Sequence, residues 1–84
     1  MVLQTTTKGT YMDENTELLR KLAFHLKTLR EERGWTQETF ADHIGMDRSS
    51  YAGTECGLHN PKLSTLKKYA DGFGMSLSEF FSAF

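Results

Sequence analysis

The side chains with the greatest intrinsic reactivity in this sequence are one cysteine, Cys56, and three histidines, His25, His43 and His59. Cys56 and His59 are close enough in sequence to suggest a thiol nucleophile and its base. Nucleophilic catalysis also needs a third group that orients the base, and the neighbouring sequence offers none. The histidines lack the companion cysteines and the short repeated spacing of zinc sites. We therefore expect no catalytic residue, no metal and no cofactor.

The elements that could position a binding surface are predicted from residues 36–57, which read TQETFADHIGMDRSSYAGTECG. This stretch contains two short helical patterns separated by Gly45, a residue type that adopts positive φ at no steric cost. Thr36 and Asp47 precede the two patterns and are suited to cap them. Because both helices are too short to bury a core of their own, they depend on flanking helices. This is the outline of a helix-turn-helix.

The second of these helices, at about residues 48–56, is predicted to present one edge to the major groove of DNA. Its predicted base-contacting residues are Arg48, Ser49, Ala52 and Gly53. Arg48 could donate two hydrogen bonds to a guanine, or it could contact a phosphate or remain solvated. Ser49 could contact a base or a phosphate, and Ala52 could at most touch a thymine methyl group.

Polar residues beside this edge are predicted to contact the DNA backbone. They are Thr36, Gln37, Ser50, His59, Asn60 and Lys62. Gln37, at the start of the first helix of the pair, is expected to hold a phosphate. Asn60 precedes a proline, which is a common arrangement in turns, so it could instead serve only to hold the loop.

Three further helices are predicted to support the pair. The first runs from Thr16 to Arg33, and its inner stripe is formed by Leu18, Leu22, Leu26 and Leu29. The fourth helix covers about residues 63–72, and a capping box at residues 76–79 opens the fifth. No segment alternates with period two, so no strand is expected. The fold class is all-α with five helices, divided into a flexible tail, residues 1–15, and one domain, residues 16–84.

Charge and hydropathy limit the class of partner. The net charge is −1, although nucleic-acid binders often carry a basic excess. Residues 36–70 hold equal numbers of acidic and basic side chains, so we expect DNA binding to depend on geometry and a few well-placed cations. No apolar run approaches the ~20 residues of a membrane span, and no signal peptide is visible. We expect a cytoplasmic protein, associated with the nucleoid when bound to DNA.

A set of residues in matching order connects the chain to a known family. They are Arg30, Thr36, Gln37, Glu38, Ala41, Gly45, Glu55, Gly57, Asn60, Pro61, Leu66, Ala70 and residues 74–81. With them, the chain from about Leu22 to Phe81 resembles the Xre/Cro/C1-type helix-turn-helix family of phage repressors, plasmid regulators and restriction-modification controller proteins. The segments DRSSYAG and HNPKL are most similar to the controller branch. The resemblance implies a lambda-repressor-like fold and a sequence-specific transcriptional regulator of double-stranded DNA.

The resemblance also implies two contacts. An arginine at position 30 would form a structural ion pair with Glu55. Small members of this family commonly form homodimers through their C-terminal helices, where this chain has Phe80, Phe81 and Phe84. Such a homodimer would place two reading helices about one turn of DNA apart and read a palindrome-like operator. The aromatic residues could otherwise serve only the core of one chain.

The sequence departs from the family pattern at Gly53, Thr54 and Cys56. The departures at Gly53 and Cys56, together with the near-zero charge of residues 36–70, leave a second function open. Gly53 stands where a long polar side chain is usual, and a glycine inside a helix costs about 1 kcal/mol relative to alanine. We interpret Gly53 as a point where the backbone approaches DNA closely. Thr54 replaces a usual apolar core residue, and Cys56 replaces a usual basic one. The alternative is a protein-interaction module, such as an antitoxin or adaptor, with little DNA affinity. Neither reading predicts a membrane partner or a small-molecule ligand.

Overall fold

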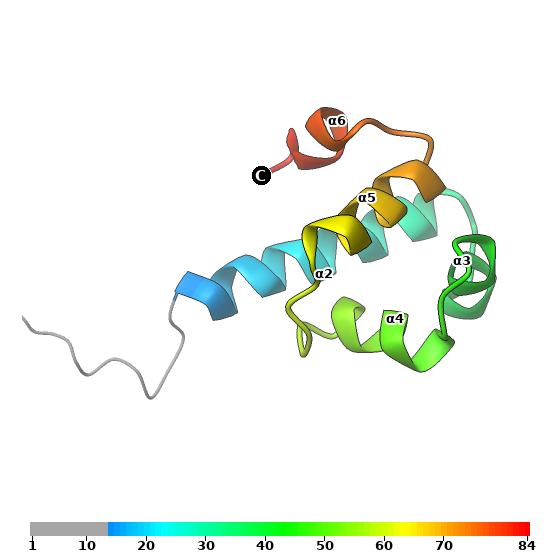
Figure 1. The fold of residues 1–84 in the computed structure, drawn as a ribbon, viewed down its shortest axis with the longest axis horizontal. Coiled ribbons are helices and arrows are strands. Elements are labelled where there is room, and N and C mark those ends of the chain that lie inside the picture. Colours follow the sequence, from blue (N-terminus) through cyan, green and yellow to red (C-terminus); the bar gives the residue numbers. More distant parts are fainter. Residues whose placement is uncertain (1–13) are drawn as a thin grey trace, which may run out of the picture.

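The computed structural model describes residues 14–84, which fold into five helices without a strand (Figure 1). The helices are α2 (Glu14–Glu32), α3 (Gln37–His43), α4 (Arg48–Glu55), α5 (Leu63–Gly72) and α6 (Leu77–Phe81). The prediction of an all-α, five-helix fold is confirmed. The predicted tail lies outside the described residues as far as residue 13, and α2 begins before the predicted start at Thr16. None of the helices within residues 14–84 has the length and apolar character required to cross a membrane.

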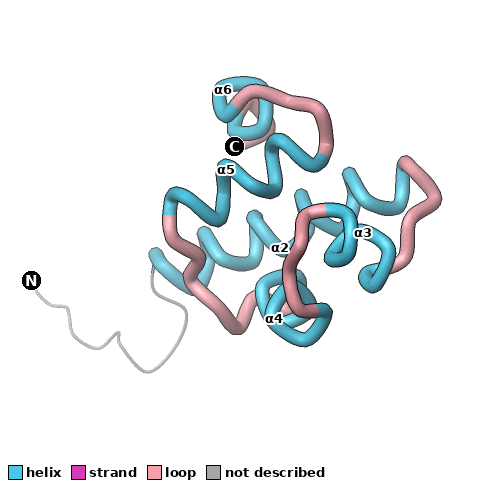
Figure 2. Tube along the Cα trace, turned by 45° about the vertical axis from the view of Figure 1, so that its right-hand side comes forward, coloured by secondary structure: helices cyan, strands magenta, loops and turns pink. Residues whose placement is uncertain are grey.

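Local sequence signals set the helix boundaries. The Thr36 hydroxyl caps α3 by accepting from the amide of Thr39 at 3.0 Å, and Asp47 caps α4. Ser76 caps α6 in the predicted capping box. Gly45, between α3 and α4, has φ of +70°, which only glycine adopts without strain. The loop between α4 and α5, residues 56–62, is longer than the turn between α3 and α4 (Figure 2).

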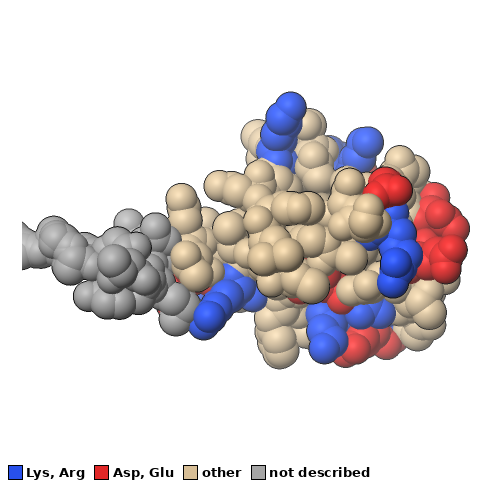
Figure 3. Space-filling view, turned by 90° about the horizontal axis from the view of Figure 1, so that it is seen from below, with Lys and Arg blue, Asp and Glu red and all other residues tan. Residues whose placement is uncertain are grey.

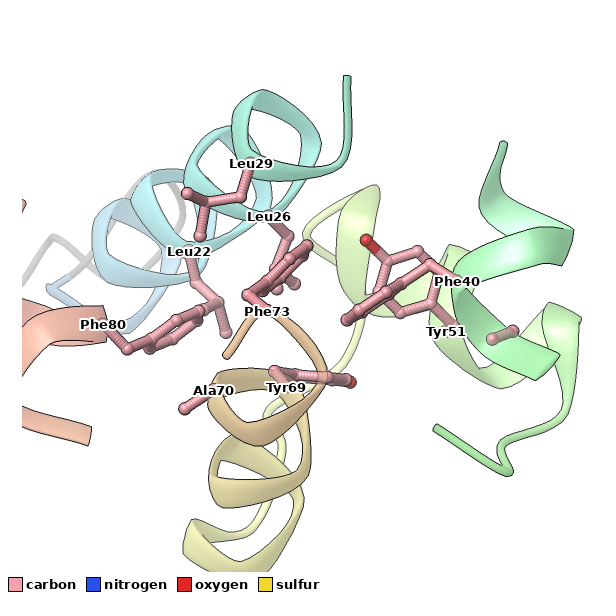
Figure 4. Packing of buried hydrophobic residues seen from close by; sticks show 10 residues of the cluster. Leu22, Leu26, Leu29, Phe40, Tyr51, Tyr69, Ala70, Phe73 and Phe80 are labelled. Carbon is pink, nitrogen blue, oxygen red and sulfur yellow. The ribbon is translucent and has the colours of Figure 1, made fainter. Parts of the chain in front are cut away.

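The core lies where the five helices meet around Phe73. Figure 4 shows the α2 leucines pointing toward Phe73 and Phe80, with Tyr51 and Phe40 on the side of the helix pair. Phe40 and Phe73 stack with their ring centroids 4.2 Å apart. The fully buried large side chains are Leu26, Phe40, Tyr51, Tyr69 and Phe80. The helix pair is therefore held against the rest of the domain by contacts between aromatic residues.

The predicted inner stripe of α2 is wrong at one position. Leu22, Leu26 and Leu29 are buried, but Leu18 is 51% exposed. The first turns of α2 extend past the other helices of residues 14–84 (Figure 1), so these helices leave Leu18 only partly covered. Helical periodicity gives the direction of a side chain but not the length over which a helix is covered.

Gly72 marks a close approach between α5 and α3. A β-carbon at this position would collide with Cγ2 of Ile44 and lie 2.9 Å from Cε1 of the buried Phe40. Overpacking of this kind costs about 1 to 3 kcal/mol, against a gain of about 1 kcal/mol in helix propensity.

We expect Gly72→Ala to lower the free energy of unfolding by about 1 kcal/mol or more, because Phe40 is locked by its stack on Phe73. Urea unfolding followed by circular dichroism measures this, with Lys68→Ala as the control at an exposed position of the same helix. A Gly72→Ala variant as stable as the wild type would contradict the close packing of α5 on α3.

Candidate nucleic-acid interface

The outer edge of α4 is accessible, and its inner side is buried. Tyr51, Thr54 and Glu55 point inward and are at most 9% exposed. Arg48 and Ser49, at the start of the helix, are exposed. Within the predicted base-reading edge, Ala52 and Gly53 are half-buried. The structure therefore leaves the N-terminal part of α4 as the portion that a large partner could approach.

The N-cap of α4 also restricts the chemistry of Ser49. The Asp47 carboxylate accepts from the amides of Ser49 and Ser50 at 3.1 and 3.3 Å and from the Ser49 hydroxyl. The bond from the Ser49 hydroxyl, with those from the amides, holds the pKa of Asp47 below its usual value. Because the Ser49 hydrogen is committed to Asp47, its oxygen is left mainly as an acceptor.

Arg30 and Glu55 form a bidentate, buried ion pair that joins α2 to the end of α4. Arg30 Nε donates to Glu55 Oε2 at 2.9 Å, and Arg30 Nη2 donates to Oε1 at 2.7 Å. Arg30 Nη1 donates to the carbonyl oxygen of Trp35 at 2.6 Å. The structure thus places together the two residues that the family resemblance pairs. Separating such a pair leaves one uncompensated buried charge, which costs about 3 to 5 kcal/mol.

The environment of this pair stabilises the charged forms. Burial by itself would raise the pKa of the Glu55 carboxyl, but the hydrogen bonds from Arg30 and Gln37 bring it below the usual value. The bond to Glu55 raises the pKa of Arg30. Burial and the adjacent Glu55 carboxylate raise the pKa of the Tyr51 hydroxyl, so it stays neutral. Glu55 is therefore ionised at neutral pH.

Gln37 lies differently from the prediction. Its amide Nε2 donates to Glu55 Oε1 at 3.1 Å, so the side chain extends toward the ion pair. The phosphate contact predicted for Gln37 would have to use its remaining amide hydrogen or the backbone. Thr36, the preceding residue, is exposed, but its hydroxyl is engaged in capping α3. The side chains at the start of α3 therefore make hydrogen bonds within the helix pair.

The loop after α4 folds back over that helix. Nδ1 of His59 lies 3.3 Å from the carbonyl oxygen of Ser50, and the His59 ring lies against Gly53. Our interpretation of Gly53 as a point of close approach to DNA is replaced by this contact within the chain. Asn60 lines an apolar groove with Pro61, and Lys62 is exposed. Of the predicted backbone contacts, Ser50, His59, Asn60 and Lys62 line one hollow beside α4.

The buried hydroxyl of Thr54 has a partner that the sequence did not indicate. Tyr69 of α5 donates to Thr54 Oγ1 at 3.2 Å. This hydrogen bond satisfies a polar group at a position where the family pattern has an apolar one. A tyrosine on α5 at a core position was the available signal, since buried tyrosines need a partner for the hydroxyl.

An apolar groove lies at the C-terminal end of the domain, and one of the predicted interface residues does not line it. The groove has a volume of about 340 Å³ and is lined by Leu18, Leu19, Leu22, Asn60, Pro61, Leu66, Phe81 and Phe84. Phe80 is fully buried, so the prediction of Phe80 as an interface residue is wrong. Its backbone carbonyl oxygen lies 2.7 Å from His25 Nε2, which ties α6 to α2. Phe81 is half-buried and Phe84 is 40% exposed.

The charged side chains are interspersed. Figure 3 views the molecule from below in the orientation of Figure 1, the side on which α4 lies, and shows basic side chains scattered over this face, several of them directly beside acidic ones. A continuous basic surface is not visible on this face. Any contact with a polyanion there must depend on single cations such as Arg48.

Comparisons with known proteins agree with the fold, which is that of a helix-turn-helix domain. The sequence profile described as "Helix-turn-helix" matches residues 26–80. The control protein C.MunI from Mycoplasma sp. is 45% identical over 58 residues, which cover 68% of this chain and 78% of C.MunI. The chain belongs to the helix-turn-helix family of Xre/Cro/C1 type.

Solved structures of controller proteins have the same fold. The restriction-modification controller protein C.AhdI from Aeromonas hydrophila matches with a TM-score of 0.73 and 35% identity over 77% of this chain and 98% of C.AhdI. The controller protein C.Esp1396I, solved as a tetramer with its natural 35 base-pair operator, matches with a TM-score of 0.73 and 33% identity over 79% of this chain and 87% of C.Esp1396I. The predicted resemblance to controller proteins is confirmed. Several other relatives, named as transcriptional regulators, are longer, and the chain spans a third to a half of their length.

We expect Glu55→Gln to lower the free energy of unfolding by about 3 kcal/mol or more at neutral pH, because Arg30 stays buried without its counter-charge. The folded-state pKa of Glu55 is lowered, so its contribution is fully present above the ordinary value of about 4.3 and is lost as pH falls through the folded value. The difference between wild type and variant should therefore shrink at acid pH.

Urea unfolding at several pH values measures this difference. Glu38→Gln, at an exposed position of α3, is the control, and it should leave the stability nearly unchanged. The carboxylate of Asp47, whose pKa is also lowered, is present in all three proteins and cancels from the comparison. A Glu55→Gln difference that is small, or the same at every pH, would contradict the role of the ion pair.

Proposed function

We propose that this protein is a sequence-specific regulator of transcription that binds double-stranded DNA as a homodimer, with α4 in the major groove. The observation that carries the proposal is the exposed start of α4 on a helix pair whose opposite side is fixed by the Arg30–Glu55 ion pair. The names of the relatives as control proteins and transcriptional regulators support the same function. We place the protein in the cytoplasm, at the nucleoid when it is bound to DNA.

Base recognition begins at Arg48. This exposed guanidinium can donate two parallel hydrogen bonds to O6 and N7 of a guanine, a contact worth about 1 to 3 kcal/mol of discrimination. The hydroxyl of Ser49 donates its hydrogen to Asp47, so the Ser49 oxygen can accept a hydrogen bond from the amino group of a cytosine or an adenine. Ala52 can contact a thymine methyl group.

The DNA backbone is held on both sides of α4. Thr36 and Gln37 contact phosphates on one side. Gln37 does so through its remaining amide hydrogen or through its backbone. Ser50, Asn60 and Lys62 flank the other side. These contacts set the register of α4 in the groove, and because they involve few cations they add little sequence-independent affinity.

Two copies associate through the apolar groove at the C-terminal end. Its leucines and Phe84 form a continuous apolar surface next to α6, which a second copy can cover. Twofold symmetry then spaces the two α4 helices about 34 Å apart, so that the homodimer reads a palindrome-like operator. The tetramer of C.Esp1396I on its operator supports an oligomeric form.

We expect Arg48→Ala to weaken binding by about tenfold or more and to relax the preference for guanine at one position of each half-site. Fluorescence anisotropy measures the affinity on duplexes that the wild-type protein selects from a randomised pool. Lys68→Ala removes the same charge from an exposed position of α5 beside Asp71, and it should bind nearly as the wild type does. If the wild-type protein selects no duplex, the proposal fails and the protein-interaction module replaces it. If Arg48→Ala binds the selected duplexes as tightly as the wild type does, the base contact of Arg48 is wrong.

We expect Phe84→Ser to shift the monomer–dimer equilibrium toward monomer, because it removes apolar area from the groove. Analytical ultracentrifugation over a range of concentrations measures the shift. Leu63→Ser is the matched control, since Leu63 is 67% exposed and lies outside the groove. Equal dimerisation of both variants and the wild type would contradict this interface.

A further inference from the structure

The His59 ring occupies the space of a side chain that α4 lacks. A β-carbon on Gly53 would lie 2.6 Å from Nδ1 and 2.7 Å from Nε2 of His59, well inside van der Waals contact. The imidazole therefore packs directly on the backbone of α4. Because His59 is exposed and Gly53 is half-buried, the loop residue supplies the outer atoms at this part of the DNA-facing edge.

The position of the ring also indicates which nitrogen donates a hydrogen bond. Nδ1 lies 3.3 Å from the carbonyl oxygen of Ser50, and a carbonyl oxygen can only accept. Nδ1 is therefore the donor, and Nε2 is an acceptor in the neutral ring and a donor in the protonated ring. Among residues 14–84, no group is hydrogen-bonded to Nε2.

The surroundings of His59 contain few other charges. The hollow beside it is also lined by Met46, Ser50, Thr54, Asn60, Pro61, Lys62, Thr65 and Tyr69. Lys62 is the one charged residue in this set, and the Tyr69 hydroxyl is engaged with Thr54. On α4 itself, Arg48 is the exposed ionisable side chain, and Cys56, also exposed, follows at the C-cap. None of the residues lining the hollow is a carboxylate that could pair with the ring.

We propose that His59 is a DNA-contacting residue that takes the place of the missing side chain at position 53. The proposal rests on the proposed function, and it assigns Nε2 of His59 to the groove as the contacting atom. The protonated ring donates to guanine N7 or O6 or to a phosphate oxygen, all of which are acceptors. The neutral ring can only accept there, so the protein binds its selected duplex more tightly as pH falls.

The first test compares wild type with His59→Gln, which keeps a polar side chain but does not titrate, and with His59→Ala. Affinity for the selected duplex is measured by anisotropy at about pH 5.5 and about pH 8, the range in which histidine changes charge. We expect the wild type to lose about threefold or more in affinity over this range beyond any loss in His59→Gln. His59→Ala should bind about tenfold more weakly than wild type at the lower pH.

The second test uses the packing itself. Gly53→Ala displaces the ring, so we expect it to reduce affinity and remove the extra pH dependence while raising helix propensity. In the double variant with His59→Gln, the Gly53 substitution should then have little further effect, since the two residues act as a pair. Circular dichroism establishes that each variant folds.

Three outcomes decide the matter. Loss of the extra pH dependence in both His59→Gln and Gly53→Ala supports the proposal. Wild-type affinity and pH dependence in the folded His59→Ala and His59→Gln variants would overturn it while leaving the Arg48 contact intact. If the wild-type protein binds no duplex at either pH, the proposed function itself fails.

Discussion

The buried ion pair between Arg30 and Glu55 is the constraint on which the proposed DNA-binding surface depends. Its two hydrogen bonds fix the end of α4 against α2, and the bond from Gln37 attaches α3 to the same carboxylate. One ionised group therefore sets the positions of three helices relative to one another. Hydrophobic burial could hold these helices together, but the bidentate geometry also specifies their orientation. The exposed edge of α4 follows from that orientation.

On the inner and the outer side of α4, a residue that departs from the pattern expected of the family contacts a side chain from a later segment of the chain. On the inner side, Thr54 at an apolar family position is matched by the Tyr69 hydroxyl. On the outer side, Gly53 at a polar position is matched by the ring of His59. In each pair the second residue lies on a later segment of the chain. The chain therefore has the helix-turn-helix fold, and side chains from the loop and from α5 pack on α4 at these two positions.

Local sequence signals predicted the fold, whereas the features that were not predicted from the sequence depend on tertiary contacts. The caps at Thr36 and Asp47 and the turn at Gly45 depend on neighbouring residues, and the structure has them where they were predicted. The exposure of Leu18 depends on how far the other helices extend along α2, which periodicity cannot indicate. The direction of the Gln37 side chain depends on packing against Glu55, a residue far from it in sequence, and the contact of His59 with Gly53 depends on how the loop after α4 folds back, which helical periodicity does not indicate.

Amide chemical shifts during a titration with DNA test the central claim most directly. The protein labelled with nitrogen-15 is titrated with a duplex that it selects from a randomised pool, and a scrambled duplex of the same length is the control. The account predicts shifts concentrated at residues 36–37, 48–53 and 58–62, with the amides of α5 and α6 little affected. Shifts centred on the apolar groove, or equal shifts with both duplexes, would contradict it.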